Sequence, residues 1–250
     1  MSQTVSRATT ILQLACDGPR SLAEIGDRLG VHRTTALRLL HTLAEAGLVR
    51  RLPDGTWGAG RGLAALAARA GGQFGLRDLA HPHLAALQES TGHTVHLAAL
   101  RESTIVYVDK LSPPGPVRMY ARIGRPVPLH TAGVSKAILA HLPAAHADEV
   151  LEGWEFTPYT PATLITRAAL DQELRAVRER GWAADEGEFE EFVHCVAVPV
   201  RNAFGDVTAA VSLTALRAQA DRAALHALLP PVRRCAGAIS EHLGYQEDPS

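Results

Sequence analysis

Cysteine is scarce in this chain of 250 residues. Its three cysteines, Cys16, Cys195 and Cys235, are odd in number and far apart, which argues against a disulfide framework or a paired metal-binding motif. The N-terminus has no charged segment followed by apolar residues, and no apolar run approaches the ~20 residues that span a bilayer. We therefore expect a soluble, cytoplasmic protein without a membrane partner.

Lysine is almost absent as well, since arginine outnumbers it 23 to 2. The net charge of −1 is unevenly distributed: residues 1–60 hold seven arginines against five acidic residues, and the remainder holds eighteen basic against twenty-one acidic residues. A mildly basic first part and an acidic body are consistent with two domains that bind different partners. Hydrophobic residues make up 46% of the chain, enough to build proper cores.

The first sixty residues predict three helices and a hairpin. The first helix, 5–16, carries an apolar stripe of Val5, Ala8, Leu12 and Ala15. Ser21 caps the second helix, with Glu24 at the spacing of a capping box. A third helix ends at Gly47, and two short strands flank Asp54-Gly55, a good hairpin turn. This order predicts a winged helix-turn-helix.

The remainder predicts a linker helix at 61–72 and then an α+β domain. Its predicted strands are 93–101, 104–111, 117–123, 193–201 and 206–214. Its predicted helices begin at Leu76, cover about 131–142 and 167–180, and include one long C-terminal helix that buries Leu225, Leu228, Leu229, Val232, Cys235 and Ile239.

The third helix has the composition of a DNA-recognition helix. The major groove of B-DNA is about 12 Å wide and admits one α-helix, whose N-terminal residues reach the bases. One face of this helix is polar and its N-terminal end is basic, and the hairpin adds two arginines that can contact phosphates. The DNA-binding candidates are Arg33, Thr34, Thr35, Arg38, His41, Arg50 and Arg51.

The segment 206–214 predicts a strand with two different faces. Ala210, Ser212 and Thr214 share one face with Asp206 and Thr208, while Val207, Ala209, Val211 and Leu213 share the other. Small residues with hydroxyl groups fit the wall of a small-ligand cavity. They fit an exposed, hydroxyl-bearing sheet face equally well, and the strand pattern alone does not decide between the two.

Two longer motifs resemble those of the isocitrate-lyase-regulator (IclR) family of bacterial transcription factors. "GRPVPLHTAGVSKAILA" at 124–140 resembles its Gly…Pro-Leu-His…Gly-Lys-Ala-x-Leu-Ala block, and "GWAADEGEFEEFVHCVAVPVRNAFGDVTAAVSL" at 181–213 resembles a second block. The chain departs from the family at His32, where relatives usually carry a capping Ser, at Ser135, where they have Gly, and at Glu191 and Phe192, where they often have small residues.

The resemblance implies a winged helix-turn-helix at 4–60, a linker helix at 61–75 and a GAF-like effector-binding domain at 76–245. It implies a transcriptional regulator, such as a repressor, that binds operator DNA as a homodimer or a dimer of dimers and needs no cofactor. The effector would be a small organic acid, aromatic or aliphatic. Matched by motif, its pocket residues are Met119, Val127, Gly133, Val134, Asp185, Cys195, Ser212 and Thr214.

Within this implied pocket, Gly133 and Val134 would offer backbone N–H groups to the carboxylate at a helix start. Ser212 and Thr214 would add hydroxyl donors. Asp185 cannot hydrogen-bond a carboxylate while ionised, so we expect it to accept from a ligand hydroxyl or from water.

The alternative is a cysteine- or metal-dependent enzyme with an accessory helical domain. Cys195 beside His194, with His130 as another base, suggests a thiol nucleophile. Adjacent strand residues point to opposite faces, however, so His194 is badly placed to activate Cys195. We therefore expect an inert cysteine and no catalysis.

Histidine pairs and a glycine-rich segment suggest two further sites that we do not favour. The close histidine pairs, 81 with 83 and 93 with 96, have no accompanying cysteine pair, so we expect no metal site. The segment Gly58–Gly62 resembles part of a dinucleotide-binding loop but does not follow a strand of a βαβ unit.

Overall fold

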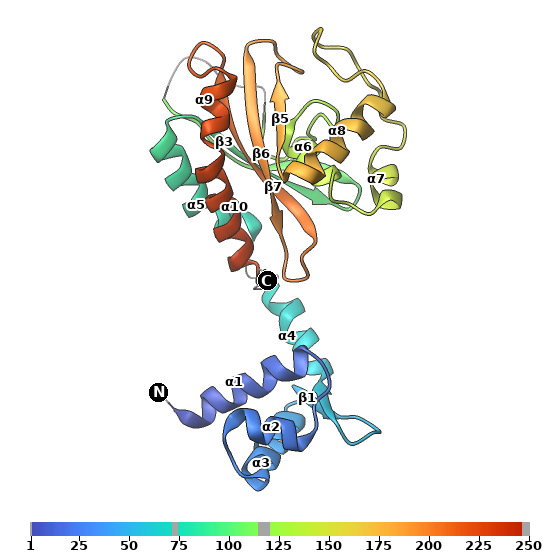
Figure 1. The fold of residues 1–250 in the computed structure, drawn as a ribbon, viewed down its shortest axis with the longest axis vertical. Helices are drawn as coiled ribbons and strands as arrows, with labels where there is room; N and C mark the ends of the chain where they lie inside the picture. The colour runs from blue at the N-terminus through green and yellow to red at the C-terminus, as the bar shows by residue number, and fades with distance from the viewer. Residues whose placement is uncertain (1, 72–74, 115–120, 247–250) are drawn as a thin grey trace. The chain divides into compact units, whose positions relative to one another are not determined.

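The computed structural model describes residues 2–71, 75–114 and 121–246. The chain divides into two compact units, Met1–Gly75 (unit 1) and Leu76–Ser250 (unit 2), shown in Figure 1. Every helix among the described residues is too short or too polar to cross a bilayer.

Unit 1 contains three packed helices, a hairpin and a fourth helix: α1 (Gln3–Cys16), α2 (Leu22–Leu29), α3 (Arg33–Glu45), β1 (Val49–Arg51), β2 (Trp57–Ala59) and α4 (Arg61–Gly71). The predicted capping box is confirmed, because Ser21 Oγ accepts from the Glu24 N–H and the Ser21 N–H donates to the Glu24 carboxylate at 2.8 Å. Gly30 ends α2 in the left-handed conformation that permits the tight turn. Unit 1 is therefore a winged helix-turn-helix.

The start of α3 is capped by an unusual residue. His32 takes the N-cap position, and its Nδ1 accepts from the Thr34 N–H at 3.4 Å. An imidazole nitrogen thus takes the role that a side-chain oxygen usually has at an N-cap. In α1 one prediction was wrong: Val5 is 66% exposed, and Ile11 is the residue fully buried in the core of unit 1.

The glycine-rich segment Gly58–Gly62 joins the hairpin to α4. A Cβ on Gly60 would lie 2.1 Å from the Gly47 carbonyl oxygen, and one on Gly62 would lie 2.7 Å from the same atom. The Gly60 N–H donates to Leu48 O, and the Gly62 N–H donates to Gly47 O, both at 2.9 Å. These glycines allow two backbone segments to approach closely.

Unit 2 is built on an antiparallel sheet whose strand order, within the described residues, is β4-β3-β7-β6-β5. The strands are β3 (Thr94–Arg101), β4 (Thr104–Leu111), β5 (Ala183–Glu186), β6 (Val193–Arg201) and β7 (Val207–Leu216). The helices are α5 (Leu76–Thr91), α6 (Gly133–Leu139), α7 (Ala144–Val150), α8 (Arg167–Arg180), α9 (Arg222–Ala227) and α10 (Leu229–His242).

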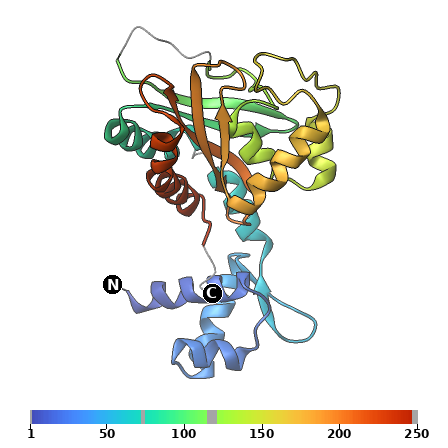
Figure 2. The same cartoon turned by 45° about the horizontal axis from the view of Figure 1, so that its top comes forward.

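Helices cover both faces of this sheet (Figure 1). The face covered by α5, α9 and α10 carries larger aliphatic residues, such as Leu97, Val196 and Leu213, and Figure 2 shows α5 and α10 side by side. The face covered by α6, α7 and α8 carries Ala98, Ala197 and Ala210. Because these alanines are small, α6 can approach the sheet closely, and all seven of its residues are buried.

Several predicted elements of unit 2 need correction. Strand β5 was not predicted, because four residues that end in Asp185 and Glu186 give no alternating pattern. The single long C-terminal helix is two helices, since two prolines occupy the first turn of α10 and interrupt the hydrogen bonds of a continuous helix. Of the predicted strand 117–123, residues 117–120 lie outside the described residues, and 121–123 do not form a strand.

Candidate functional site

The outer face of α3 carries most of the predicted DNA-binding residues. Arg33, Thr34, Arg38 and His41 are exposed and Thr35 is half-buried, whereas the opposite face buries Ala36, Leu40 and Leu43 in the core. Within the part of the chain that the structure describes, neither arginine of α3 forms an ion pair. Their charges are therefore available to an external partner.

The hairpin adds charge beside this face. Arg50 and Arg51 are both exposed on β1, and the His41 ring contacts the Trp57 ring of β2 edge-on at 5.9 Å between centroids. Glu45, which the sequence analysis did not consider, is exposed at the C-terminal end of α3, four residues after His41. Because this carboxylate would repel phosphate, the C-terminal end of α3, beyond His41, is the part least suited to DNA.

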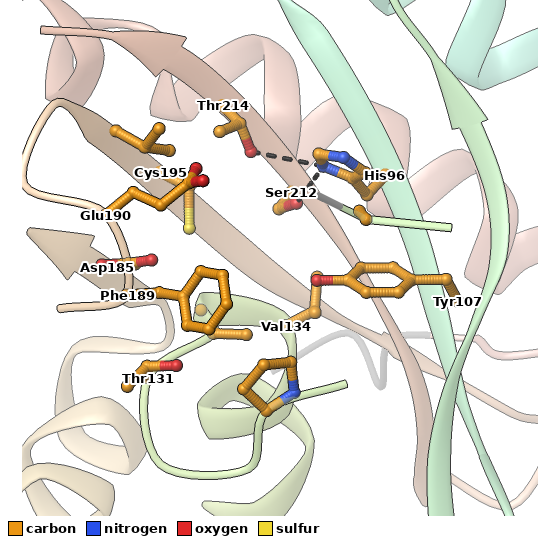
Figure 3. A pocket seen from close by; sticks show the side chains of 15 residues that line it. His96, Tyr107, Thr131, Val134, Asp185, Phe189, Glu190, Cys195, Ser212 and Thr214 are labelled. Atoms are coloured by element: carbon orange, nitrogen blue, oxygen red, sulfur yellow. Dashed lines mark hydrogen bonds between the residues drawn. The ribbon is translucent and has the colours of Figure 1, made fainter. Parts of the chain in front are cut away.

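A cavity of about 60 Å³ lies in unit 2 between α6 and the sheet (Figure 3). Six of the predicted effector residues line it: Gly133, Val134, Asp185, Cys195, Ser212 and Thr214. Val127, predicted as a wall, is instead buried in the core between the sheet and α6 to α8. Met119 lies outside the described residues.

The cavity also has lining residues that the sequence analysis did not predict: His96, Tyr107, Thr131, Phe189 and Glu190. His96 could have been found once strand pairing was known, because it lies directly opposite Ser212 in the β3–β7 register. In the view of Figure 3, His96, Ser212 and Thr214 lie together, and Thr131 lies at the other end of the pocket.

The hydroxyl groups of Ser212 and Thr214 on β7 face the cavity and not solvent. Ser212 is 3% exposed and Thr214 is 5% exposed, so the exposed-face interpretation is wrong. The predicted alternation of faces holds from Ala209 to Thr214 but not at Val207, because a β-bulge between Val200 and Arg201 turns Val207 toward the opposite face from Ala209.

Cys195 is a buried thiol against the start of α6. A Cβ on Gly133 would lie 2.7 Å from Cys195 Sγ, so glycine is needed for this close approach. Burial, together with the nearby Asp185 carboxylate, raises the pKa of the Cys195 thiol to about 12. A thiol of this kind is uncharged at neutral pH and is a poor nucleophile.

The two histidines of the enzyme alternative are not placed to activate Cys195. His194 pairs with Glu186 across β5 and β6, and the charges around it are those of Arg217, Glu186 and α9. His130 is fully buried, where its Nδ1 accepts from Trp154 Nε1 at 2.9 Å and its Nε2 lies 3.0 Å from Thr157 O. Neither arrangement supplies a base to Cys195.

Asp185 also belongs to a buried charge cluster with Lys136 and Glu188. Lys136 is completely buried, and its Nζ donates to Glu188 Oε1 at 2.5 Å. Asp185 Oδ1 accepts from the Glu188 N–H at 2.7 Å. Burial raises the pKa of Asp185 to about 6 and that of Glu188 to about 7, although the Lys136 charge opposes both shifts. The cluster thus contains two carboxyl groups and a single cation, Lys136, whose charge can compensate only one carboxylate in full.

The histidines that are close together in the sequence contact different parts of the fold. His81 Nδ1 lies 2.6 Å from the Asp109 carboxylate, His83 contacts the His242 ring, and His96 lines the cavity. Among the residues that the structure describes, no group of three or more His, Cys, Asp or Glu side chains could hold a metal ion.

Comparisons with known proteins agree with this architecture. Residues 4–53 match the model of the IclR helix-turn-helix domain, and residues 69–241 match that of the bacterial transcriptional regulator IclR C-terminal domain. The chain is 35% identical to the HTH-type transcriptional regulator XynR of Escherichia coli over 97% of this chain and 98% of that protein.

Solved structures show the same likeness. A putative IclR transcriptional regulator from Silicibacter sp. TM1040 matches with a TM-score of 0.82 and 26% identity, covering 100% of this chain and 98% of that one. An IclR homologue from Microbacterium hydrocarbonoxydans, complexed with 4-hydroxybenzoate, matches with a TM-score of 0.61 and 26% identity, covering 96% of this chain and 98% of that one.

Proposed function

This chain belongs to the IclR family of bacterial transcriptional regulators, and we propose that it binds operator DNA through α3 and the hairpin under the control of a small organic acid bound in unit 2. DNA binding follows from the family. The residues that carry it, the effector and the assembly are our proposals.

The exposed face of α3, with its unpaired arginines, is the observation that supports the DNA interface most directly. Arg33 and Arg38 can contact bases or phosphates from the groove, and Arg50 and Arg51 can contact the flanking phosphates. Thr34, Thr35 and His41 complete the proposed surface. Because one winged helix contacts few base pairs, we infer that two chains bind two half-sites as a homodimer or a dimer of dimers.

Replacing Arg38 with alanine should weaken operator binding by about 1–3 kcal/mol, which is roughly 5- to 150-fold, because a charged contact to base or phosphate is lost. Fluorescence anisotropy measures this with a duplex from the promoter next to the protein's own gene. Arg101→Ala removes the same charge from an exposed position in unit 2 and should leave the affinity unchanged. Equal affinities for wild type and Arg38→Ala would exclude Arg38 from the interface.

In unit 2, we propose that six residues of the pocket contact the effector: Gly133, Val134, Asp185, Cys195, Ser212 and Thr214. The proposed effector is a small organic acid, aliphatic or aromatic, whose carboxylate is bound by the donors of this pocket. The division into a DNA-binding part (4–60), a linker (61–75) and an effector-binding part (76–245) remains our proposal for how these roles are distributed.

Replacing Ser212 with alanine should weaken binding of the effector by about 1–3 kcal/mol, because a hydroxyl donor to a carboxylate is removed. Thermal-shift titration of wild type with small aliphatic and aromatic carboxylic acids first identifies a stabilising acid. The same titration is then run on Ser212→Ala and on the control Thr208→Ala, which lies on the same strand outside the pocket. If Ser212→Ala responds like wild type, the acid is bound elsewhere.

A further inference from the structure

His96 differs from the other pocket residues because it contacts the hydroxyl groups of both Ser212 and Thr214 on β7. Its Nδ1 lies 3.4 Å from Ser212 Oγ and 3.3 Å from Thr214 Oγ1, and the two dashed lines in Figure 3 converge on this nitrogen. The other ring nitrogen, Nε2, is buried and has no hydrogen-bond partner among the described residues. Within the same residues, neither hydroxyl group has a second hydrogen-bond partner.

The surroundings of His96 keep its ring neutral. Burial and the charge of Lys110, its neighbour across the β3–β4 register, lower the pKa of His96 to about 3. The Tyr107 ring lies 5.5 Å from the imidazole between centroids, and Ser212 and Thr214 face it from β7. A neutral imidazole carries one proton, so one nitrogen donates and the other accepts.

The two possible tautomers differ in what they leave unpaired. With the proton on Nε2, a buried N–H donor has no acceptor, and orphaned buried N–H groups are rare in proteins. With the proton on Nδ1, only an Nε2 lone pair is left unpaired, while Nδ1–H donates to a hydroxyl oxygen. In this second tautomer the hydroxyl hydrogens of Ser212 and Thr214 are no longer needed by the imidazole.

We propose that His96 is a positioning residue that shares its single Nδ1–H between the hydroxyl oxygens of Ser212 and Thr214 in a three-centre hydrogen bond. Because both oxygens then accept from the imidazole, both hydroxyls are free to act as donors to a bound carboxylate. This inference rests on the proposed function of the pocket and adds its selectivity. A carboxylate offers only acceptor oxygens, whereas the corresponding amide replaces one of them with a donor. The pocket is therefore expected to prefer an acid over its own amide.

The tautomer is tested without any ligand. The full-length protein is labelled with ¹⁵N in its histidine rings, and His96 is assigned from the signals that disappear in His96→Asn. The expected result is a neutral ring protonated on Nδ1 whose shifts do not change between about pH 5 and pH 9, well above the lowered pKa. Protonation on Nε2, or titration within this range, would overturn the proposal even if acids bind.

Selectivity is tested with lactate against lactamide and with benzoate against benzamide, by calorimetric titration of three proteins. In His96→Asn the side-chain amide nitrogen takes the place of Nδ1 and keeps a donor there, whereas His96→Leu has the same shape without one. Wild type and His96→Asn should bind the acid more tightly than its amide. In His96→Leu the ratio of the two dissociation constants should fall about tenfold, the equivalent of one hydrogen bond.

The outcomes separate the inference from the function on which it rests. An unchanged preference in His96→Leu means that His96 only fills space and overturns the inference while the pocket stands. If neither acid binds wild type, the proposed effector class is wrong for these probes, and the tautomer measurement alone then decides whether His96 makes the hydroxyls donors.

Discussion

Replacing Lys136 with methionine should lower the free energy of unfolding of unit 2 by about 3–5 kcal/mol, the usual loss when one partner of a buried ion pair is removed. Lys136 is completely buried and donates to Glu188, which is itself next to Asp185. Methionine fills a similar volume without charge, so the two carboxyl groups would lose the cation that compensates them. They would then have to be protonated or exposed to water.

Urea unfolding followed by tryptophan fluorescence measures this loss, because Trp154 and Trp182 both lie in unit 2. The double variant Lys136→Met/Glu188→Gln should be more stable than Lys136→Met alone, since it removes one of the two uncompensated acids. It also provides a measurement if the single variant does not fold. A loss below about 1 kcal/mol in Lys136→Met would show that the cluster does not depend on the lysine.

The second large effect is a change of stability with pH. The folded protein raises the pKa of Glu188 from 4.5 to about 7 and that of Asp185 from 3.8 to about 6, chiefly through burial. Folded chains therefore retain protons that unfolded chains release as the pH rises through this range. The contribution of these groups to stability accordingly falls between about pH 4 and pH 7 and then levels off.

Comparing wild type with Glu188→Gln isolates this effect from the other titrating groups. Glutamine resembles the protonated acid. In this variant the cluster keeps one cation, Lys136, and one carboxyl group, Asp185, so their charges can balance. The stability of Glu188→Gln relative to wild type should rise by about 3 kcal/mol from pH 4 to pH 8, as expected for a pKa shift of this size. Urea unfolding at a series of pH values measures it, and a difference independent of pH would contradict the raised pKa of Glu188.

The helices and turns of this protein were largely predictable because their signals are local. Ser21 and Glu24 form the predicted capping box, α8 spans the predicted 167–180, and the turn at Asp54-Gly55 closes the hairpin. Each depends on residues a few positions apart, whose conformational preferences do not need the rest of the chain. The polar face of α3 was readable for the same reason, since helical spacing fixes which side chains share a face.

The pocket was predictable only in part. Strand alternation placed Ser212 and Thr214 on one face but could not tell whether that face was buried, and resemblance to a family supplied Gly133, Val134, Asp185 and Cys195. Val127 is buried in the core and does not line the cavity, because a motif match does not show whether a side chain ends in the cavity or in the core beside it.

The sequence by itself determined the order of the elements, the helix caps, the hairpin and the basic face of α3. Only the tertiary structure places His96 opposite Ser212 and turns the Val207 side chain to the other face of the sheet at a β-bulge. It also places Lys136 against Glu188, fifty-two residues away in the chain. Strand register and burial decide these contacts. Both depend on how distant segments pack, and so does the dielectric environment that shifts the pKa of a buried carboxyl group.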